Sequence, residues 1–142
     1  MSKTIKYRVI YGDTDCGGVV YYGTYFRLFE MGRTELLRSS GLTYATIENE
    51  EGLILPVVEA HARYRAPARY DDELLIKTSL TELYPHKVRF DYAISRAGRL
   101  LVEGYTVHAP INRAGKLVKF PARILHFLEG LARSEKSENN NE

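Results

Sequence analysis

The first hydrophobic pattern along the chain is an alternation near the N-terminus. Apolar or aromatic side chains occupy every second position from Ile5 to Tyr11, with Lys6 and Arg8 between them, and Gly12 follows. An alternation of period two is typical of a strand that buries one face. We therefore expect a strand over Ile5–Tyr11 that ends at the glycine.

The pattern then changes to the period of a helix, over Thr24–Ser40. The apolar stripe of this helix surrounds Gly32 and consists of Tyr25, Leu28, Phe29, Leu36 and Leu37. The charged side chains fall on the other face, which we expect to be exposed: Arg27, Glu30, Arg33, Glu35 and Arg38. Thr24 is a possible N-cap and Gly41 a C-terminal stop. A glycine inside a helix lowers its stability by about 1 kcal/mol relative to alanine, so Gly32 indicates close packing against a sheet.

Strands dominate the rest of the chain, after a second, short helix over Thr43–Glu50. Four strands are expected, and turn signals separate them: Val57–Arg65, Leu74–Leu83, Lys87–Ser95 and Leu100–Asn112. The connections after Leu83 are too short for crossover helices, so these strands should be antiparallel. We also expect a short edge strand at Leu117–Phe120 and a final helix that Pro121 opens.

The order of these elements predicts the fold class. A strand, a long helix and a run of antiparallel strands indicate an α+β domain, with one central helix wrapped by a curved antiparallel sheet. We expect a single domain over residues 1–131. Residues 132–142, ARSEKSENNNE, are polar and low in complexity, which is typical of a disordered tail.

Composition excludes several classes of protein. Lys and Arg number 20 against 18 Asp and Glu, and a formal charge of +2 is too small to indicate nucleic-acid binding. The single cysteine rules out an internal disulfide and a cysteine-based metal cluster. The N-terminus has no signal-peptide pattern, and no apolar run approaches the ~20 residues that span a bilayer. We therefore expect a cytoplasmic protein with no stable membrane insertion.

The stretch DTDCGGVVYYGTYF, from Asp13 to Phe26, is the densest in reactive groups. A DxD motif after a strand can bind magnesium in a phosphotransferase, but that fold needs alternating strands and helices, and hairpins follow here. Alternatively, Asp13 and Asp15 form a turn by accepting backbone N–H groups, and we favour this role for Asp13. In the third interpretation, the glycines Gly17 and Gly18 hold a catalytic carboxylate against an apolar ligand slot.

These residues also carry a resemblance. RVIYGDTDCGGVVYYGTYFRLFEMGRTELLRSSG resembles the signature of the 4-hydroxybenzoyl-CoA thioesterase family of hotdog-fold proteins, and specifically its acyl-CoA thioesterase branch found in bacterial Tol-Pal operons. YRAPARYDDELLI is similar to a second segment of that branch, and the match covers roughly Lys6 to Leu131. The resemblance implies hydrolysis of an acyl-CoA thioester to a carboxylic acid and CoA. It also implies that no metal or redox cofactor is needed, and that the chain forms a homodimer or homotetramer.

The resemblance also implies roles for individual residues. Asp15 is the expected catalytic carboxylate, either as a nucleophile or as a general base to water. Backbone N–H groups near Tyr22 and Gly23 would stabilise the oxyanion, and Gly18 would let the loop approach the substrate. Tyr11 matches a tyrosine of the family's site, although a core aromatic is an equal alternative. The branch commonly has a histidine where this chain has Tyr22. Because tyrosine has an ordinary pKa of about 10, we expect Tyr22 to act mainly through its backbone and by orienting the substrate, not by proton transfer.

The remaining candidates have weaker signals. Cys16 has no histidine near it in sequence, and the four histidines, His61, His86, His108 and His126, lack metal-ligand spacing. Four cations are candidates for the CoA phosphates: Arg65, Arg69, Lys119 and Arg123. Three apolar side chains are candidates for the wall of the acyl pocket: Phe29, Leu36 and Val58. An enoyl-thioester hydratase or dehydratase and a non-catalytic acyl-CoA sensor stay open as alternative functions.

Overall fold

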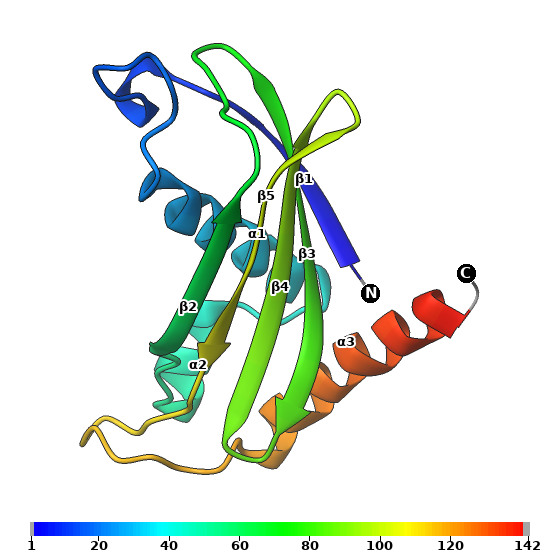
Figure 1. Cartoon of the computed structure of the whole chain (residues 1–142). Coiled ribbons are helices and arrows are strands. Elements are labelled where there is room, and N and C mark those ends of the chain that lie inside the picture. The colour runs from blue at the N-terminus through cyan, green and yellow to red at the C-terminus, as the bar shows by residue number, and fades with distance from the viewer. Residues whose placement is uncertain (1, 141–142) are drawn as a thin grey trace.

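A five-stranded antiparallel sheet wraps around one long helix in the computed structural model (Figure 1). The structure describes residues 2–140, and for residues 134–140 the backbone alone. The strands are β1 (Ser2–Arg8), β2 (Val57–Tyr64), β3 (Glu73–Tyr84), β4 (Lys87–Arg96) and β5 (Arg99–His108). The helices are α1 (Thr24–Ser39), α2 (Tyr44–Glu51) and α3 (Ala122–Asn140), with a 3-10 turn η1 at Tyr11–Asp13. The strand order is β1-β3-β4-β5-β2 and every neighbouring pair is antiparallel, which confirms the predicted α+β class.

The helix α1 packs on the sheet through the stripe that the sequence predicts. All five apolar side chains of the stripe are buried, and so is Gly32. A Cβ atom added at Gly32 would lie 2.2 Å from Thr78 Oγ1 and 3.1 Å from Ile76 Cγ2, both on β3. The glycine is therefore needed for the close approach of α1 to β3, as predicted.

The charged side chains of α1 differ more in their exposure and partners than the periodicity suggests. Glu35 and Arg38 form an exposed ion pair on this face, with 3.4 Å between Oε1 and Nε. Arg33, however, is partly buried, and its Nε has no hydrogen-bond partner within the described part of the chain. Arg27 reaches back to the buried Asp13. The expectation of an exposed face is therefore wrong at Arg33, whereas Arg27 stays exposed although it pairs with a buried carboxylate.

Two strands end earlier than the alternation predicts, and one expected strand does not form. β1 ends at Arg8, because the chain turns into η1, where the Asp13 carboxylate accepts the N–H of Ile10 at 2.9 Å. β5 ends at His108, shortly before Pro110, which has no N–H to donate to a ladder. The segment Leu117–Phe120 makes only an isolated bridge to Ile111 and is not a strand.

The C-terminal helix is longer than expected. α3 begins at Ala122 as predicted, but its backbone continues to Asn140 rather than ending at Leu131. Disorder of the tail at residues 132–142 stays a prediction, and residues 141–142 lie outside the described residues. No helix in the described range is both long and apolar enough to cross a membrane.

The strand β2 is an open edge of the sheet. It pairs with β5 on one side, and within the described residues no strand pairs with its other side. Nearly all of its side chains are exposed, and Val58 keeps 59% of its surface accessible. α1 covers β1, β3 and β4 instead. A long, unpaired edge of this kind favours pairing with another chain.

Candidate active site

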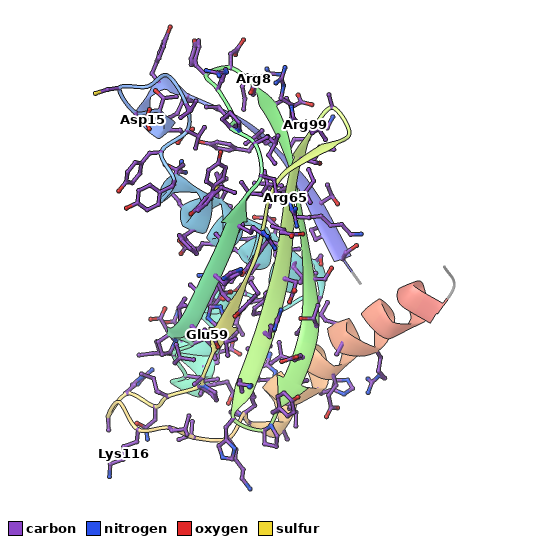
Figure 2. The ribbon with its side chains drawn as sticks, in the orientation of Figure 1. Arg8, Asp15, Glu59, Arg65, Arg99 and Lys116 are labelled. Carbon is purple, nitrogen blue, oxygen red and sulfur yellow. The ribbon has the colours of Figure 1, made fainter. Side chains whose placement is uncertain are left out.

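The loop between η1 and α1 closes tightly on Asp15. The Asp15 N–H donates to the Val19 carbonyl at 2.9 Å, and the Gly18 N–H donates to the Asp15 carbonyl at 3.1 Å. Gly18 has a φ of +80°, a left-handed conformation that glycine adopts without strain. The predicted role of Gly18 is thus partly one of turn geometry. Figure 2 shows Asp15 on this loop, beyond the N-terminal end of α1.

The Asp15 side chain is exposed and has few partners. Its Oδ1 atom accepts the Gly17 N–H at 2.7 Å, and the described residues supply no other hydrogen bond to its carboxylate. The bond to Gly17 fixes the orientation of the carboxyl group and leaves Oδ2 available. Asp15 can therefore approach a ligand without first breaking an ion pair.

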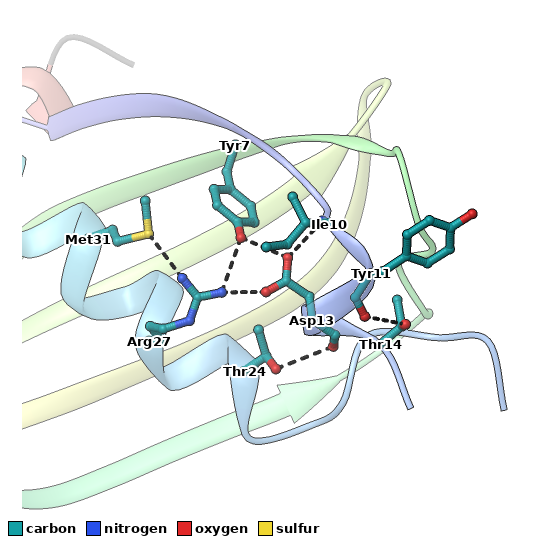
Figure 3. Close-up of polar contacts among 8 residues, drawn as sticks. All are labelled: Tyr7, Ile10, Tyr11, Asp13, Thr14, Thr24, Arg27 and Met31. Carbon is teal, nitrogen blue, oxygen red and sulfur yellow. Dashed lines mark hydrogen bonds and ion pairs between the residues drawn. The ribbon is translucent and has the colours of Figure 1, made fainter. Parts of the chain in front are cut away.

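Asp13 has the opposite environment. Only 3% of its surface is exposed, and three donors reach its carboxylate (Figure 3). Tyr7 Oη donates at 2.7 Å and the Ile10 N–H at 2.9 Å, both to Oδ2, while Arg27 donates to Oδ1. Burial, together with the Asp13 charge, raises the pKa of Tyr7, so this phenol stays a donor. The turn-forming role predicted for Asp13 is confirmed.

The N-terminus of α1 presents unused N–H groups. The N–H groups of Thr24, Tyr25 and Phe26 donate to the carbonyls three residues before them. Those of Tyr22 and Gly23 donate to no described residue. Because the N-terminus of a helix carries a partial positive charge, these two amides suit an anionic oxygen.

Thr24 does not cap α1 as expected. The N-cap residue is Gly23, and no side chain caps the helix there. Thr24 is the first helical residue, and its Oγ1 donates to the Asp13 carbonyl at 3.4 Å. An N-cap side chain accepts the N–H two or three residues after it, so the free amides of Tyr22 and Gly23 are not its targets.

A largely apolar groove of about 300 Å³ lies beside these amides. Its lining comes from the loop, from α1 and from the end of β2 with the following residues: Val19, Val20, Tyr22, Tyr25, Tyr64, Arg65, Ala66 and Pro67. Tyr64 Oη donates to the Tyr22 carbonyl at 3.0 Å and so joins the two walls. Asp15 does not itself line the groove, but its N–H donates to the carbonyl of Val19, which does.

The predicted site residues are only partly brought together. Tyr22 lines the groove, and Gly23 follows it at the start of the helix. Tyr11 lies in η1, stacks on Tyr70 with 3.7 Å between ring centroids, and is 72% exposed, so its alternative role as a core aromatic is wrong. Sequence reasoning missed Tyr25 and Tyr64 as lining residues, although Tyr64 lies at the start of the segment YRAPARYDDELLI.

None of the three residues predicted to form the wall of the acyl pocket lines the groove. Phe29 and Leu36 are fully buried in the core of the chain and do not line the groove. Val58 is exposed on the edge strand β2 and does not line it either. The helical stripe predicts burial correctly but does not separate core positions from lining positions.

Of the four candidate cations, only two lie near the groove. Arg65 lines it but forms an ion pair with Glu103. Arg69 forms a bridge with Val19 through its backbone, and its guanidinium makes no ion pair with a described residue. Arg123 is held by Glu50 at 2.7 Å on α2, and Lys119 lies outside the lining. Arg69 is thus the best placed of the four candidate cations.

The cysteine and the histidines are not placed for chemistry at the groove. Cys16 is exposed beside Asp15, and none of the four histidines lines the groove. His108 is buried, where its ring contacts the Leu55 carbonyl at 3.0 Å and Thr106 Oγ1 at 2.8 Å. Burial lowers the pKa of His108 to about 4. The described residues hold no group of three His, Cys, Asp or Glu side chains that could bind a metal.

A second hollow of about 300 Å³ lies on the outer face of the sheet, over β2, β4 and β5. Its charges are largely paired: Arg89 binds Asp91 at 2.8 Å and lies 3.9 Å from the centre of the Tyr105 ring. It has neither a free carboxylate comparable to Asp15 nor a helix N-terminus. The groove at α1 is therefore the better candidate site.

Comparison with known proteins decides the family. Residues 9–128 match the thioesterase-like superfamily, a range that includes the loop, the groove and the strands β2 to β5. The chain belongs to the thioesterase-like superfamily. The predicted hotdog fold is confirmed, and so is the prediction of an enzyme of the thioester hydrolase class.

Members of the superfamily resemble this chain over most of its length. The acyl-CoA thioesterase YbgC of Haemophilus influenzae is 34% identical over 119 residues, covering 82% of this chain and 87% of that protein. A hypothetical protein from Thermus thermophilus has a crystal structure that superimposes with a TM-score of 0.87 at 34% identity, covering 92% of this chain and 98% of the other. A 1,4-dihydroxy-2-naphthoyl-CoA thioesterase from Synechocystis superimposes with a TM-score of 0.82 at 27% identity, covering 94% and 96%.

Proposed function

We propose that the protein is an acyl-CoA thioesterase in which Asp15 carries the reaction and the N–H groups of Tyr22 and Gly23 bind the oxyanion. The observation that supports this most is the geometry of one loop. It presents an exposed carboxylate with a free oxygen and two unused amides at a helix N-terminus, next to an apolar groove. The similarity to YbgC and to a 1,4-dihydroxy-2-naphthoyl-CoA thioesterase supports the substrate class.

The chemistry needs few further groups. A thioester carbonyl is electrophilic, so a carboxylate can attack it or can deprotonate a water that attacks it. In either case the carbonyl oxygen becomes an oxyanion, and the Tyr22 and Gly23 amides donate to it. One such donor typically contributes about 3 to 4 kcal/mol in the transition state. The C–S bond then breaks, and CoA leaves as the thiolate.

The two roles of Asp15 differ in their intermediates. If Asp15 Oδ2 attacks, a mixed anhydride forms between the acyl group and the Asp15 carboxyl, and water then hydrolyses it. If Asp15 acts as a base, water oxygen goes directly into the product acid. Single-turnover hydrolysis in oxygen-18 water separates them, because label enters the Asp15 carboxylate when water attacks the aspartyl carbonyl of the anhydride.

The acyl group is proposed to be apolar. Tyr22, Tyr25 and Tyr64 contribute rings to the groove, and its remaining lining is mainly aliphatic.

We also propose that the chain belongs, within the superfamily, to the 4-hydroxybenzoyl-CoA thioesterase family and to its branch found in Tol-Pal operons. The motif from Asp13 to Phe26 supports this proposal.

The test is to incubate the protein with a panel of short, long and aromatic acyl-CoAs and to measure hydrolysis by the release of free thiol. We expect thiol release with at least one apolar acyl group and no hydration of an enoyl-CoA. Hydration of the enoyl chain without thiol release would instead indicate a hydratase. Tight binding of acyl-CoA without turnover would indicate a sensor, and either result would overturn the proposal.

We further propose that two chains pair through β2. The edge is unpaired and exposed, and the groove opens beside its end at Tyr64. A charge on a strand edge opposes pairing, so Val58→Lys should reduce the mass in solution from that of a dimer or tetramer to that of a monomer. Leu117→Lys, at a position 58% exposed outside the sheet, is the matched control and should leave the mass unchanged. A monomeric wild type would contradict this assembly.

A further inference from the structure

Asp13 holds together the two halves of the proposed site. Its main-chain carbonyl accepts the Tyr21 N–H at 2.8 Å and Thr24 Oγ1 at 3.4 Å. These two donors flank Tyr22 and Gly23 in the sequence, and Asp15 follows Asp13 by two residues. The place of Asp13 therefore determines how the carboxylate and the free amides lie relative to each other.

The side chain of Asp13 is in turn held by two elements. Tyr7 reaches it from β1, and Arg27, the fourth residue of α1, reaches it from the helix (Figure 3). Arg27 Nη2 also donates to Tyr7 Oη at 3.1 Å, which closes a triangle of hydrogen bonds. Its Nη1 lies 3.9 Å from Met31 Sδ, one turn further along the helix. The guanidinium thus connects the helix that carries the amides to the aspartate that precedes the catalytic loop.

Arg27 has no direct access to a substrate in the groove. It is absent from the groove lining, and its polar contacts are with Asp13, Tyr7 and Met31. Any effect of Arg27 on turnover must therefore pass through the position of other groups.

We propose that Arg27 is a positioning residue for thioester hydrolysis: through Asp13 it sets the place of Asp15 relative to the N–H groups of Tyr22 and Gly23. This inference rests on the proposed function. The carboxylate and the oxyanion donors must act on the same carbonyl group, and a misplacement of about 1 Å can lower a rate by about a hundredfold. Binding of the acyl chain depends on the groove, which Arg27 does not line.

The first test compares kcat with KM. Arg27→Ala should lower kcat by about 10- to 100-fold and change KM by less than about threefold, because transition-state geometry is lost while the groove is kept. Arg27→Lys should recover part of kcat, since lysine keeps the charge but not the planar fork. Arg38→Ala, which removes an exposed pair on the same helix, should leave kcat unchanged. The folded fraction is measured by near-ultraviolet circular dichroism of the tyrosines, and kcat is expressed per folded chain.

The second test asks whether Arg27 acts through Asp15. In an Asp15→Asn background, adding Arg27→Ala should lower the residual kcat by no more than about threefold, because residues that act as a unit are not additive. An equal loss in both backgrounds, or a wild-type kcat in Arg27→Ala, would overturn the inference. If Arg27→Ala does not fold, Tyr7→Phe removes one donor to Asp13 and keeps the ring; it should lower kcat by about 3- to 10-fold at constant KM, and an unchanged kcat would again overturn the inference.

The proposed function and this inference fail in different ways. Normal turnover by Asp15→Asn would remove the proposed catalytic role, whatever Arg27 does. Loss of turnover in Asp15→Asn together with normal turnover in Arg27→Ala would leave the catalytic role intact and refute only the positioning role.

Discussion

Asp13 and Asp15 have the same side chain and lie two residues apart, yet the fold gives them opposite environments. Asp13 is buried under three donors, whereas Asp15 is exposed with one. The turn-forming role of Asp13 was predicted from its place near the glycines and is confirmed, whereas the catalytic role of Asp15 follows from the family resemblance and stays a proposal. The sequence did not predict Arg27 as a partner, because that residue is 14 positions away and lies on the face expected to be solvated.

At the residue scale, we predict that Arg69 contributes to the binding of CoA. Its guanidinium makes no ion pair with a described residue and its backbone borders the loop that carries Asp15, so it can meet a phosphate of the nucleotide. We expect Arg69→Ala to raise KM for acyl-CoA by about 5- to 20-fold with little change in kcat. An N-acetylcysteamine thioester, which lacks the nucleotide, should show no such change.

Arg123→Ala provides the matched control for Arg69. Arg123 is an arginine of similar exposure, but it binds Glu50 on α2 and lies outside the groove lining. Its removal should leave KM for acyl-CoA unchanged. Equal effects of both variants, or a rise in KM for the short thioester, would contradict a phosphate contact at Arg69.

At the scale of the elements, periodicity predicted which segments are helices and strands but not where they end. The stripe of α1 and the alternation of β4 follow from burial of one face, which the sequence records directly. The ends of β1 and β5 depend on a side-chain acceptor at Asp13 and on Pro110, and Leu117–Phe120 makes a single bridge, to Ile111, which lies in no strand. Such boundaries depend on tertiary contacts, which a local pattern does not contain.

The packing of α1 on the sheet can be tested by a substitution at Gly32. A Cβ atom there would lie 2.2 Å from Thr78 Oγ1, so α1 must move away from β3. Overpacking of this kind typically lowers stability by about 1 to 3 kcal/mol, which outweighs the gain of about 1 kcal/mol in helix propensity. We expect Gly32→Ala to lower the free energy of unfolding, measured with urea.

The control for Gly32 is another helical glycine. Apart from its chain neighbours and the backbone of α3 itself, the described residues place no atom within 4 Å of a Cβ built on Gly130, so Gly130→Ala should raise the stability by up to about 1 kcal/mol. A stabilising Gly32→Ala would show that the contact with β3 is looser than the structure has it.

At the scale of the whole molecule, the groove is assembled from segments that are distant in sequence. Tyr22 and Tyr64 lie 42 residues apart and meet through one hydrogen bond. The sequence identified both segments by resemblance, but their contact follows only from the way β2 runs beside the start of α1. The sequence also predicted the hotdog fold, because the order of elements and the motif indicated the same arrangement.

His108 gives the molecule a predictable dependence on pH. Burial lowers its pKa from the ordinary 6.5 to about 4, so below pH 6.5 the unfolded chain binds a proton that the folded chain excludes. The contribution of His108 to the free energy of unfolding is fully present above pH 6.5, and it decreases as the pH falls towards 4. Between pH 7 and pH 5 we expect it to lower the free energy of unfolding by about 2 kcal/mol.

Urea unfolding at both pH values measures this dependence. His108→Gln should remove about 2 kcal/mol of the pH-dependent change, whatever its effect on stability at pH 7. His86→Gln, at an exposed turn, should keep the wild-type dependence. A dependence that survives in His108→Gln would mean that other groups are responsible.

The most direct test of the account is turnover of acyl-CoA by Asp15→Asn compared with Cys16→Ala. Both positions are exposed neighbours on the same loop, and only Asp15 has a proposed chemical role. With the fold intact, Asp15→Asn should lower kcat by about a thousandfold or more, and Cys16→Ala should stay within about twofold of the wild type. Near-wild-type turnover by Asp15→Asn would contradict the account.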